Sequence, residues 1–128
     1  SINMLGSSPV YCTMPAVDIQ RAKEFYTQKL GLKFIEIPGA DTGGMFEAGD
    51  GTRIILYERE ASKAEHTAAT FSVDDVEVIV DGLTARGVVF EQYDLDEIKT
   101  DQRGIAVLGN IKAAWFYDSE GNIIGIMS

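Results

Sequence analysis

The chain has 128 residues, of which 45% are hydrophobic and 24% charged, a composition typical of a globular protein rather than a disordered one. Twenty acidic residues against eleven basic ones give a formal net charge of −9, which repels a phosphate backbone and argues against nucleic-acid binding. No apolar run approaches the roughly 18 residues of a membrane span, and nothing resembles a signal peptide.

A single cysteine, Cys12, rules out an internal disulfide and is typical of a reducing cytoplasm, which is the expected location. With a single histidine, His66, the chain lacks the roughly four ligands of a zinc site made of Cys and His alone. The length predicts one domain over residues 1–128. Residues 1–8 are interpreted as an N-terminal extension, in part an expression remnant before Met4, and are left out of the fold prediction.

In the first half, an apolar strand from Pro9 leads to Asp18, a residue that commonly caps a helix. The predicted helix ends at Gly31, where a left-handed C-cap residue belongs. Its apolar positions recur at helical spacing: Ile19, Ala22, Phe25, Tyr26 and Leu30. A strand over residues 32–37, a glycine-rich connection, another strand, a turn at 48–51 and a last strand over 52–58 follow.

The second half repeats this order. A strand near Thr67 is followed by a helix that Asp74 or Asp75 caps and Gly87 ends. Strands are predicted over residues 88–93 and 122–127, the last after a turn at 119–121. Each half is therefore β-α-β-β-β, with an offset of about 57 residues in the first strand and helix. The predicted fold class is α+β, with module 1 at about 9–60 and module 2 at about 66–127; the alternative is an unrelated α+β domain with chance similarity.

Three stretches carry a resemblance to a known family: VDIQRAKEFYTQKLGLKF (17–34), FSVDDVEVIVDGLTARGVVF (71–90) and YDSEGNIIGI (117–126). Together they resemble the vicinal oxygen chelate superfamily, which includes glyoxalase I, extradiol dioxygenases, and fosfomycin-resistance and bleomycin-resistance proteins. The last stretch is similar to the family's Asp-Pro-Asp-Gly-Asn turn, with Ser119 at the proline position. The resemblance implies two βαβββ modules whose curved mixed sheets form a concave cup, but the family hosts many chemistries.

The resemblance also locates the metal-ligand positions. Members that use a metal bind it with four side chains, usually His, Gln or Glu, from the first and last strands of the two modules. Here those positions hold Tyr11, Ile55, Ala68 and Gly125. Three of them offer no side-chain donor, and a neutral phenol is a poor ligand for a hard cation. A shifted site would need His66 with Glu58 or Glu65, which alternate onto the other face, so we expect no metal and no cofactor.

Without bulky ligands, the cup is predicted to be an open, mostly apolar pocket for a small molecule. Residues two apart on a strand share a face, which gives the predicted ligand-binding set. Its members are Tyr11, Thr13, Ile55, Tyr57, His66, Ala68, Trp115, Tyr117, Gly125 and Met127. The sequence leaves open whether Trp115 or Phe116 points inward. Alternatively, the cup collapses into a filled core, the aromatic cluster packs between sheets or in a dimer, and His66 lies on the surface.

Three functions follow from this interpretation. The first is a metal-free, bleomycin-resistance-like protein that binds an apolar or aromatic ligand, including a cationic one because the chain is acidic. The second is a glyoxalase-type or dioxygenase-type lyase or isomerase with an unorthodox site around His66, Tyr11 and Tyr57. The third is a scaffold without a ligand. The resemblance further implies a homodimer, and neither nucleic acid nor membrane is an expected partner.

Overall fold

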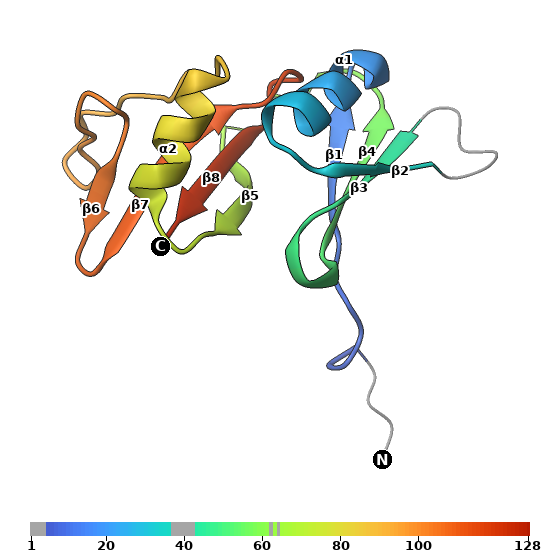
Figure 1. Ribbon diagram of the computed structural model, residues 1–128, viewed down its shortest axis with the longest axis horizontal. Helices are drawn as coiled ribbons and strands as arrows, with labels where there is room; N and C mark the ends of the chain where they lie inside the picture. The colour runs from blue at the N-terminus through green and yellow to red at the C-terminus, as the bar shows by residue number, and fades with distance from the viewer. Residues whose placement is uncertain (1–4, 37–42, 62, 64) are drawn as a thin grey trace.

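A computed structural model describes residues 5–36, 43–61, 63 and 65–128. The described chain forms two four-stranded mixed sheets, each with a helical segment on one face and neither closed into a barrel (Figure 1). The strand order is β1-β4-β3-β2 in the first sheet and β5-β8-β7-β6 in the second. The predicted α+β class and the repeated order of elements are therefore confirmed.

The first module contains β1 (Cys12–Ala16), α1 (Ile19–Glu24) continued by the π-helix η1 (Phe25–Lys29), β2 (Lys33–Ile35), β3 (Gly43–Glu47), the 3-10 turn η2 (Gly49–Gly51) and β4 (Arg53–Glu58). Strand β1 runs parallel to β4, whereas β2, β3 and β4 are antiparallel neighbours. The strand predicted over residues 32–37 is present but shorter, and the last predicted residue, Ile37, lies outside the described residues.

The second module contains β5 (Thr67–Ser72), α2 (Val76–Ala85), β6 (Ala106–Leu108), β7 (Ile111–Tyr117) and β8 (Ile123–Met127). The strand predicted over residues 88–93 is wrong, because in that stretch only Phe90 forms a bridge, to Phe116 of β7. Residues 94–103 are largely polar and satisfy their backbone in a local hairpin, in which the Thr100 amide donates to the Tyr93 carbonyl at 2.9 Å. The chain rejoins the sheet edge at β6, so two separate segments share that edge.

Both helices begin and end at the residues that the sequence indicates. The Asp18 side chain caps α1, and Asp75 rather than Asp74 caps α2. Gly31 and Gly87 follow the helices with φ angles of 79° and 90°, which suit a left-handed C-cap. The interval from cap to glycine is one residue longer in the first module, and the π-helix η1 takes up the extra residue.

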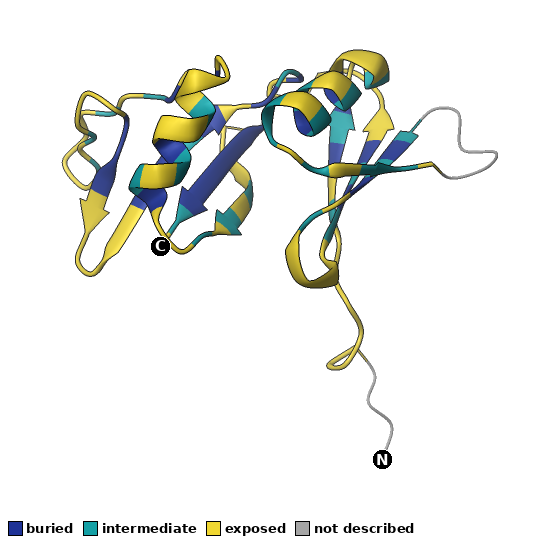
Figure 2. Ribbon diagram, in the orientation of Figure 1, coloured by how far each residue is buried: buried dark blue, intermediate teal, exposed yellow. Residues whose placement is uncertain are grey.

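The two modules share one hydrophobic core, in which η1 contacts both sheets. The Tyr26 ring packs against Phe46 of β3 at a centroid distance of 5.3 Å, and Phe25 faces Phe116 of β7 at 6.4 Å. Figure 2 shows further buried residues along β8. The helix-covered faces therefore turn toward this core, and the opposite face of each sheet carries no helix. No helix in the described part of the chain is long and apolar enough to cross a membrane.

A buried polar turn joins the second module to the first helix. The turn between β7 and β8, residues 118–122, buries Asp118, Glu120 and Asn122. The Asp118 carboxylate accepts the amides of Glu120 and Asn122 at 2.8 Å and the Tyr26 hydroxyl at 2.6 Å. Asn122 donates its side-chain amide to the carbonyl of Pro15 at 3.0 Å. These contacts, with those of Glu120 described next, form what we call the turn clasp.

Glu120 supplies the ion pair of the turn clasp. Its side chain is fully buried and accepts the Asp18 amide at 2.8 Å and two bonds from the Arg21 guanidinium, at 2.8 and 3.1 Å. Burial opposes ionisation of this carboxyl, but the bonds from Arg21 and from the Asp18 amide outweigh burial and lower its pKa. Burial, followed by the charge of Asp118, raises the pKa of Tyr26, which therefore remains a hydrogen-bond donor.

We expect Glu120→Gln to lower the free energy of unfolding by about 1–3 kcal/mol at pH 7, because it weakens a buried charge-assisted acceptor. A carboxylate whose folded-state pKa is lowered stabilises the fold above its ordinary pKa and loses that contribution as the pH falls through the folded-state value. The unmodified protein should therefore lose stability below about pH 4.3, and the variant should lose less. Urea unfolding at several pH values measures both, with the exposed Glu24→Gln as control; the same acid sensitivity in all three proteins would contradict this role.

Candidate functional site

The helix-free face of the first sheet carries Thr13, Ile55 and Tyr57 of the predicted residues, and Tyr11, just before β1, joins them beside Arg53. Thr13 of β1 lies opposite Ile55 of β4, and Met45 of β3 continues the same row. The alternating residues Met14 and Leu56 are buried in the core. Because successive side chains of a strand point to opposite faces, the row points away from the helices. The first sheet therefore offers a mixed apolar and hydroxyl surface.

A guanidinium group crosses this face beside Tyr11. The Arg53 guanidinium lies 5.7 Å from the centre of the Tyr11 ring and donates to Met45 Sδ at 3.2 Å. Its Nε is buried and meets no hydrogen-bond partner among the described residues. A buried donor of this kind is normally satisfied, and an acceptor on a ligand would satisfy it. The sequence reasoning missed Arg53, although it stands two residues before Ile55 on the same face of β4.

The helix-free face of the second sheet carries four more predicted residues: Trp115, Tyr117, Gly125 and Met127. Trp115 of β7 lies opposite Gly125 of β8, and Thr70 of β5 lies on the other side of the glycine. Phe116 is buried in the core, with its ring against Phe90 at 5.4 Å. This decides the alternative that the sequence left open, since Trp115 rather than Phe116 points to the helix-free face.

Gly125 makes room for the side chain of Trp115. The space above this glycine, which was predicted to be open, is therefore filled. A Cβ atom at this position would lie 3.3 Å from Trp115 Cδ1, 3.2 Å from Thr70 Oγ1 and 3.4 Å from Thr67 Cγ2. The vacancy predicted at Gly125 is therefore occupied by the indole edge and two threonines. The glycine lets the indole lie close to the sheet, so the surface there is an aromatic platform rather than a hole.

A bulge displaces Ala68 from its predicted place in the row. The register of β5 against β8 shifts between Thr67 and Ala69, which leaves Ala68 unpaired. Its carbonyl accepts the Cys12 thiol at 3.5 Å, from the core-facing side of β1. Thr70, rather than the predicted site residue Ala68, therefore pairs with Gly125. An extra residue shifts the alternation of a strand by one position, but residues 67–70 are only threonines and alanines, so the sequence shows no clear alternation there.

Two residues that the sequence reasoning missed complete the second face. The bridge between Phe90 and Phe116 sets Glu91 opposite Trp115, and the Glu91 amide donates to the Trp115 carbonyl at 2.8 Å. The Tyr93 ring meets the indole edge-on at 5.7 Å. The pairing places Glu91 on the same face as Trp115. Burial, followed by the charge of Glu91, raises the pKa of Tyr93. The available signal was their spacing: Glu91 and Tyr93 stand one and three residues after Phe90, so both point to the face opposite this core residue.

Among the described residues, the titratable side chains do not gather into a metal-binding cluster, and the cysteine thiol is not activated as a nucleophile. His66 is exposed just before β5, and no three His, Cys, Asp or Glu side chains in the described residues lie close enough to share an ion. Cys12 faces the core, and burial raises the pKa of its thiol, which keeps it in the unreactive protonated form.

The two predicted groups of residues lie on separate faces of the chain. The hydrogen bond between β1 and β5 comes from Cys12, on the core-facing side, and the helix-covered faces share one core. Tyr11, Tyr57 and Tyr117 are 37%, 39% and 46% exposed, respectively. The two helix-free faces are thus outer surfaces of one chain and do not close over each other, as Figure 1 shows for the two sheets standing side by side.

The sequence model of the Glyoxalase/Bleomycin resistance protein/Dioxygenase superfamily matches residues 8–126. The chain therefore belongs to this superfamily, which confirms the resemblance carried by its three sequence stretches. A comparison with curated protein sequences gives no significant match.

Solved structures agree on the fold. UcmS2 superposes with a TM-score of 0.73 at 17% identity, covering 94% of this chain and 97% of its own. TnmS3, an antibiotic binding protein from Streptomyces sp. CB03234, gives 0.67 at 20% identity, with 98% and 97% covered. Lactoylglutathione lyase from Agrobacterium tumefaciens gives 0.65 at 19% identity, with 94% and 92% covered. At these identities the likeness shows the fold and no more.

Gly125→Ala should lower the free energy of unfolding by about 1 kcal/mol, because the added methyl group forces the indole or Thr70 to move. Trp115 is the single tryptophan, so its emission should shift to the red as the ring leaves the sheet. Gly49→Ala, where a Cβ meets nothing within 4 Å, is the matched control and should leave both readings unchanged. Unchanged emission in Gly125→Ala would show that the indole does not depend on the glycine.

Proposed function

We propose that the protein is a metal-free small-molecule-binding protein that holds an aromatic ligand bearing an amine. The row formed by Glu91, Trp115 and Gly125 carries this proposal. An indole face attracts flat ligands and cations, and a carboxylate beside it favours a positive charge. Tyr93 and Tyr117 extend the aromatic surface, and the net charge of −9 attracts a cation over longer range. The antibiotic-binding neighbour supports the proposal as an analogy of fold alone.

The residues at the four metal-ligand positions support binding without a metal. Ile55, Ala68 and Gly125 have no donor, and Tyr11 already stacks beside the Arg53 guanidinium. On the first face, Arg53 Nε offers a donor to an acceptor on the ligand. A ligand that contacts both helix-free faces would thus carry a hydrogen-bond acceptor at the end near Arg53 and an amine at the end near Glu91. The lone Cys12 supports a cytoplasmic location, which we retain as part of the proposal.

We further propose that a homodimer completes the binding cup. Each chain exposes one half of the cup on each of two outer faces, so the first face of one copy can close over the second face of another. The exposed tyrosines Tyr11, Tyr57 and Tyr117 are the residues such a contact would cover. A cup built from two copies also brings the Arg53 donor and the Glu91 carboxylate to the same ligand.

Cationic aromatic compounds should raise the melting temperature and quench the emission of Trp115, because they stack on the indole. Glu91→Gln should weaken the binding of a quaternary aryl-ammonium compound about tenfold, and should leave the binding of its neutral isostere unchanged. Glu58→Gln, a carboxylate variant on β4, is the matched control. Equal loss for the charged and neutral compounds would remove Glu91 from the site. Stoichiometric metal in protein purified without chelator would favour an enzyme instead.

Light scattering during size-exclusion chromatography should give twice the chain mass of 14.0 kDa. Tyr57→Glu places a charge on the face that the dimer is expected to cover and should shift the protein toward the monomer. Val89→Glu, on an exposed residue that lies outside the predicted set, should not. A monomer that binds the aryl-ammonium compound with full affinity would contradict a cup shared between two copies.

A further inference from the structure

We propose a second binding site on the core-facing side of the chain, between α2 and the turn that joins β3 to β4, for a small apolar molecule that carries an anionic group. A cavity of about 530 Å³ opens there, within the size range of small-molecule sites. Its walls come from both modules and include Leu30, Ala48, Phe71, Ile79 and Leu83. It lies on the opposite side of β7 and β8 from Trp115 and Gly125, so the inference is independent of the binding function proposed above.

The internal repeat explains why this space is open. Equivalent elements of the two modules face each other twice: the β7–β8 turn contacts α1, and the β3–β4 turn lies across the cavity from α2. The first contact is the turn clasp, centred on Tyr26 and Asp118. Counting from the helix caps and from the turn glycines, Leu83 stands where Tyr26 stands, and Ala48 stands where Asp118 stands. Neither replacement can form the hydrogen bond that Tyr26 and Asp118 form, so this half of the interface lacks the equivalent buried bond.

A missing aromatic ring provides the volume. Phe25 fills the first contact, with its ring 6.4 Å from Phe116. By the same count its counterpart on α2 is Gly82, and a Cβ atom there would meet nothing within 4 Å. A glycine in the interior of a helix costs about 1 kcal/mol relative to alanine. Gly82 therefore costs helix stability, and its missing side chain leaves open space beside Phe116 and Ile126, which line the same cavity.

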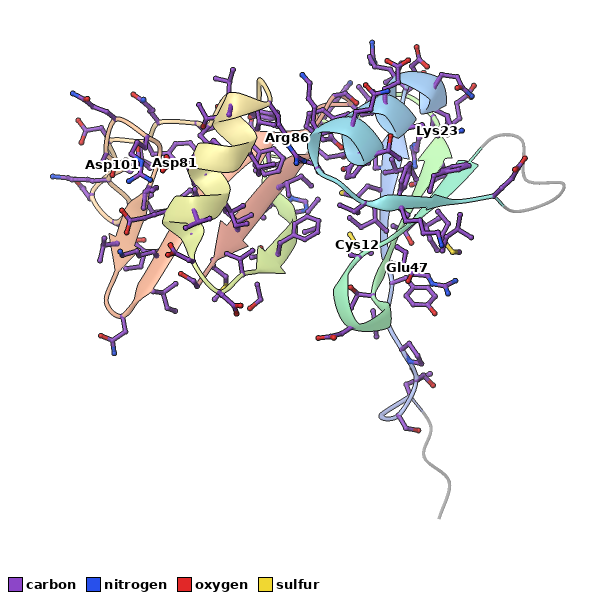
Figure 3. The ribbon with its side chains drawn as sticks, viewed as in Figure 1. Cys12, Lys23, Glu47, Asp81, Arg86 and Asp101 are labelled. Atoms are coloured by element: carbon purple, nitrogen blue, oxygen red, sulfur yellow. The ribbon has the colours of Figure 1, made fainter. Side chains whose placement is uncertain are left out.

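The rim of the cavity carries a fixed positive group. Arg86, one turn after Gly82, lines the cavity and donates from Nη1 to the carbonyl of Lys29 at 3.2 Å. Figure 3 shows Arg86 between α2 and the end of η1, with Glu47 across on the first module. The bond to Lys29 holds the guanidinium in place and uses one of its five N–H groups. The guanidinium suits a carboxylate or sulfonate on an otherwise apolar molecule that lies with its anionic group toward Arg86 and away from the Glu47 carboxylate.

The test uses 8-anilinonaphthalene-1-sulfonate (ANS), an apolar dye with one sulfonate, titrated into the folded protein. Gly82→Phe restores the ring that Phe25 provides in the other half, and should weaken dye binding roughly tenfold or more by filling the cavity. Gly82→Ala is the matched control, since it improves the helix without filling the space and should retain binding. Both variants should melt at or above the temperature of the unmodified protein, which separates a filled cavity from a misfolded chain.

Two further variants locate the dye. Arg86→Gln should weaken ANS about tenfold and leave the neutral dye Nile red unaffected, because only ANS has a charge for the guanidinium to meet. Trp115→Leu alters the cup alone and should leave ANS affinity unchanged, so that failure of the cup proposal and failure of this one are distinguishable. Equal ANS affinity in Gly82→Phe and Gly82→Ala overturns the inference. So does dye binding that appears only on dimer dissociation, which would mean that a second copy covers the cavity.

Discussion

The turn clasp is the interaction on which the arrangement of the chain depends. Three buried polar residues of one short turn bond to the N-terminus of α1, to Tyr26 and to the carbonyl of Pro15. Buried charges are tolerated only where hydrogen-bond partners satisfy them. The turn can therefore pack against the first module in essentially one position. That position fixes α1 against the second sheet and places η1 in a core common to both modules. The helix-free faces consequently lie outside, where they can meet a ligand or a second copy.

The turn that is similar to the family's characteristic turn has a structural role in this chain, because it joins the two modules. The stretch Asp118 to Asn122 is the part most similar to the superfamily's characteristic turn, and its two carboxylates and its amide bond to residues of the first module. None of them faces the surfaces assigned to ligand binding. The motif therefore identifies the fold, while the residues that could act on a ligand lie on strands where the family pattern is absent. This separation explains how one architecture accommodates unrelated activities.

Much of the fold was predictable because its determinants are local. The aspartate caps, the glycine C-caps and the apolar periodicities lie within a few residues of the elements that they define, and the repeat of these signals gave the two modules. The errors arose where tertiary contacts decide. The segment after Phe90 has strand propensity, but its polar continuation forms a hairpin of its own. The bulge at Ala68 and the closeness of Trp115 to Gly125 depend on how β5 and β7 pair with β8, and the small residues around Ala68 carry no pattern that reveals this pairing.

Two glycines of this chain have opposite structural effects. At Gly125, neighbours crowd the missing side chain, and the residue permits an indole to lie against the sheet. At Gly82, no atom lies within 4 Å of the missing side chain, and the residue leaves open space where its counterpart in the first module, Phe25, places a ring. From sequence alone both are simply weak points in a regular element, where glycine carries an entropic cost. Only the surrounding atoms separate a glycine that accommodates a side chain from one that leaves a space. In this chain, the first shapes the surface proposed for an aromatic ligand, and the second shapes the apolar space on the other side of the same strands.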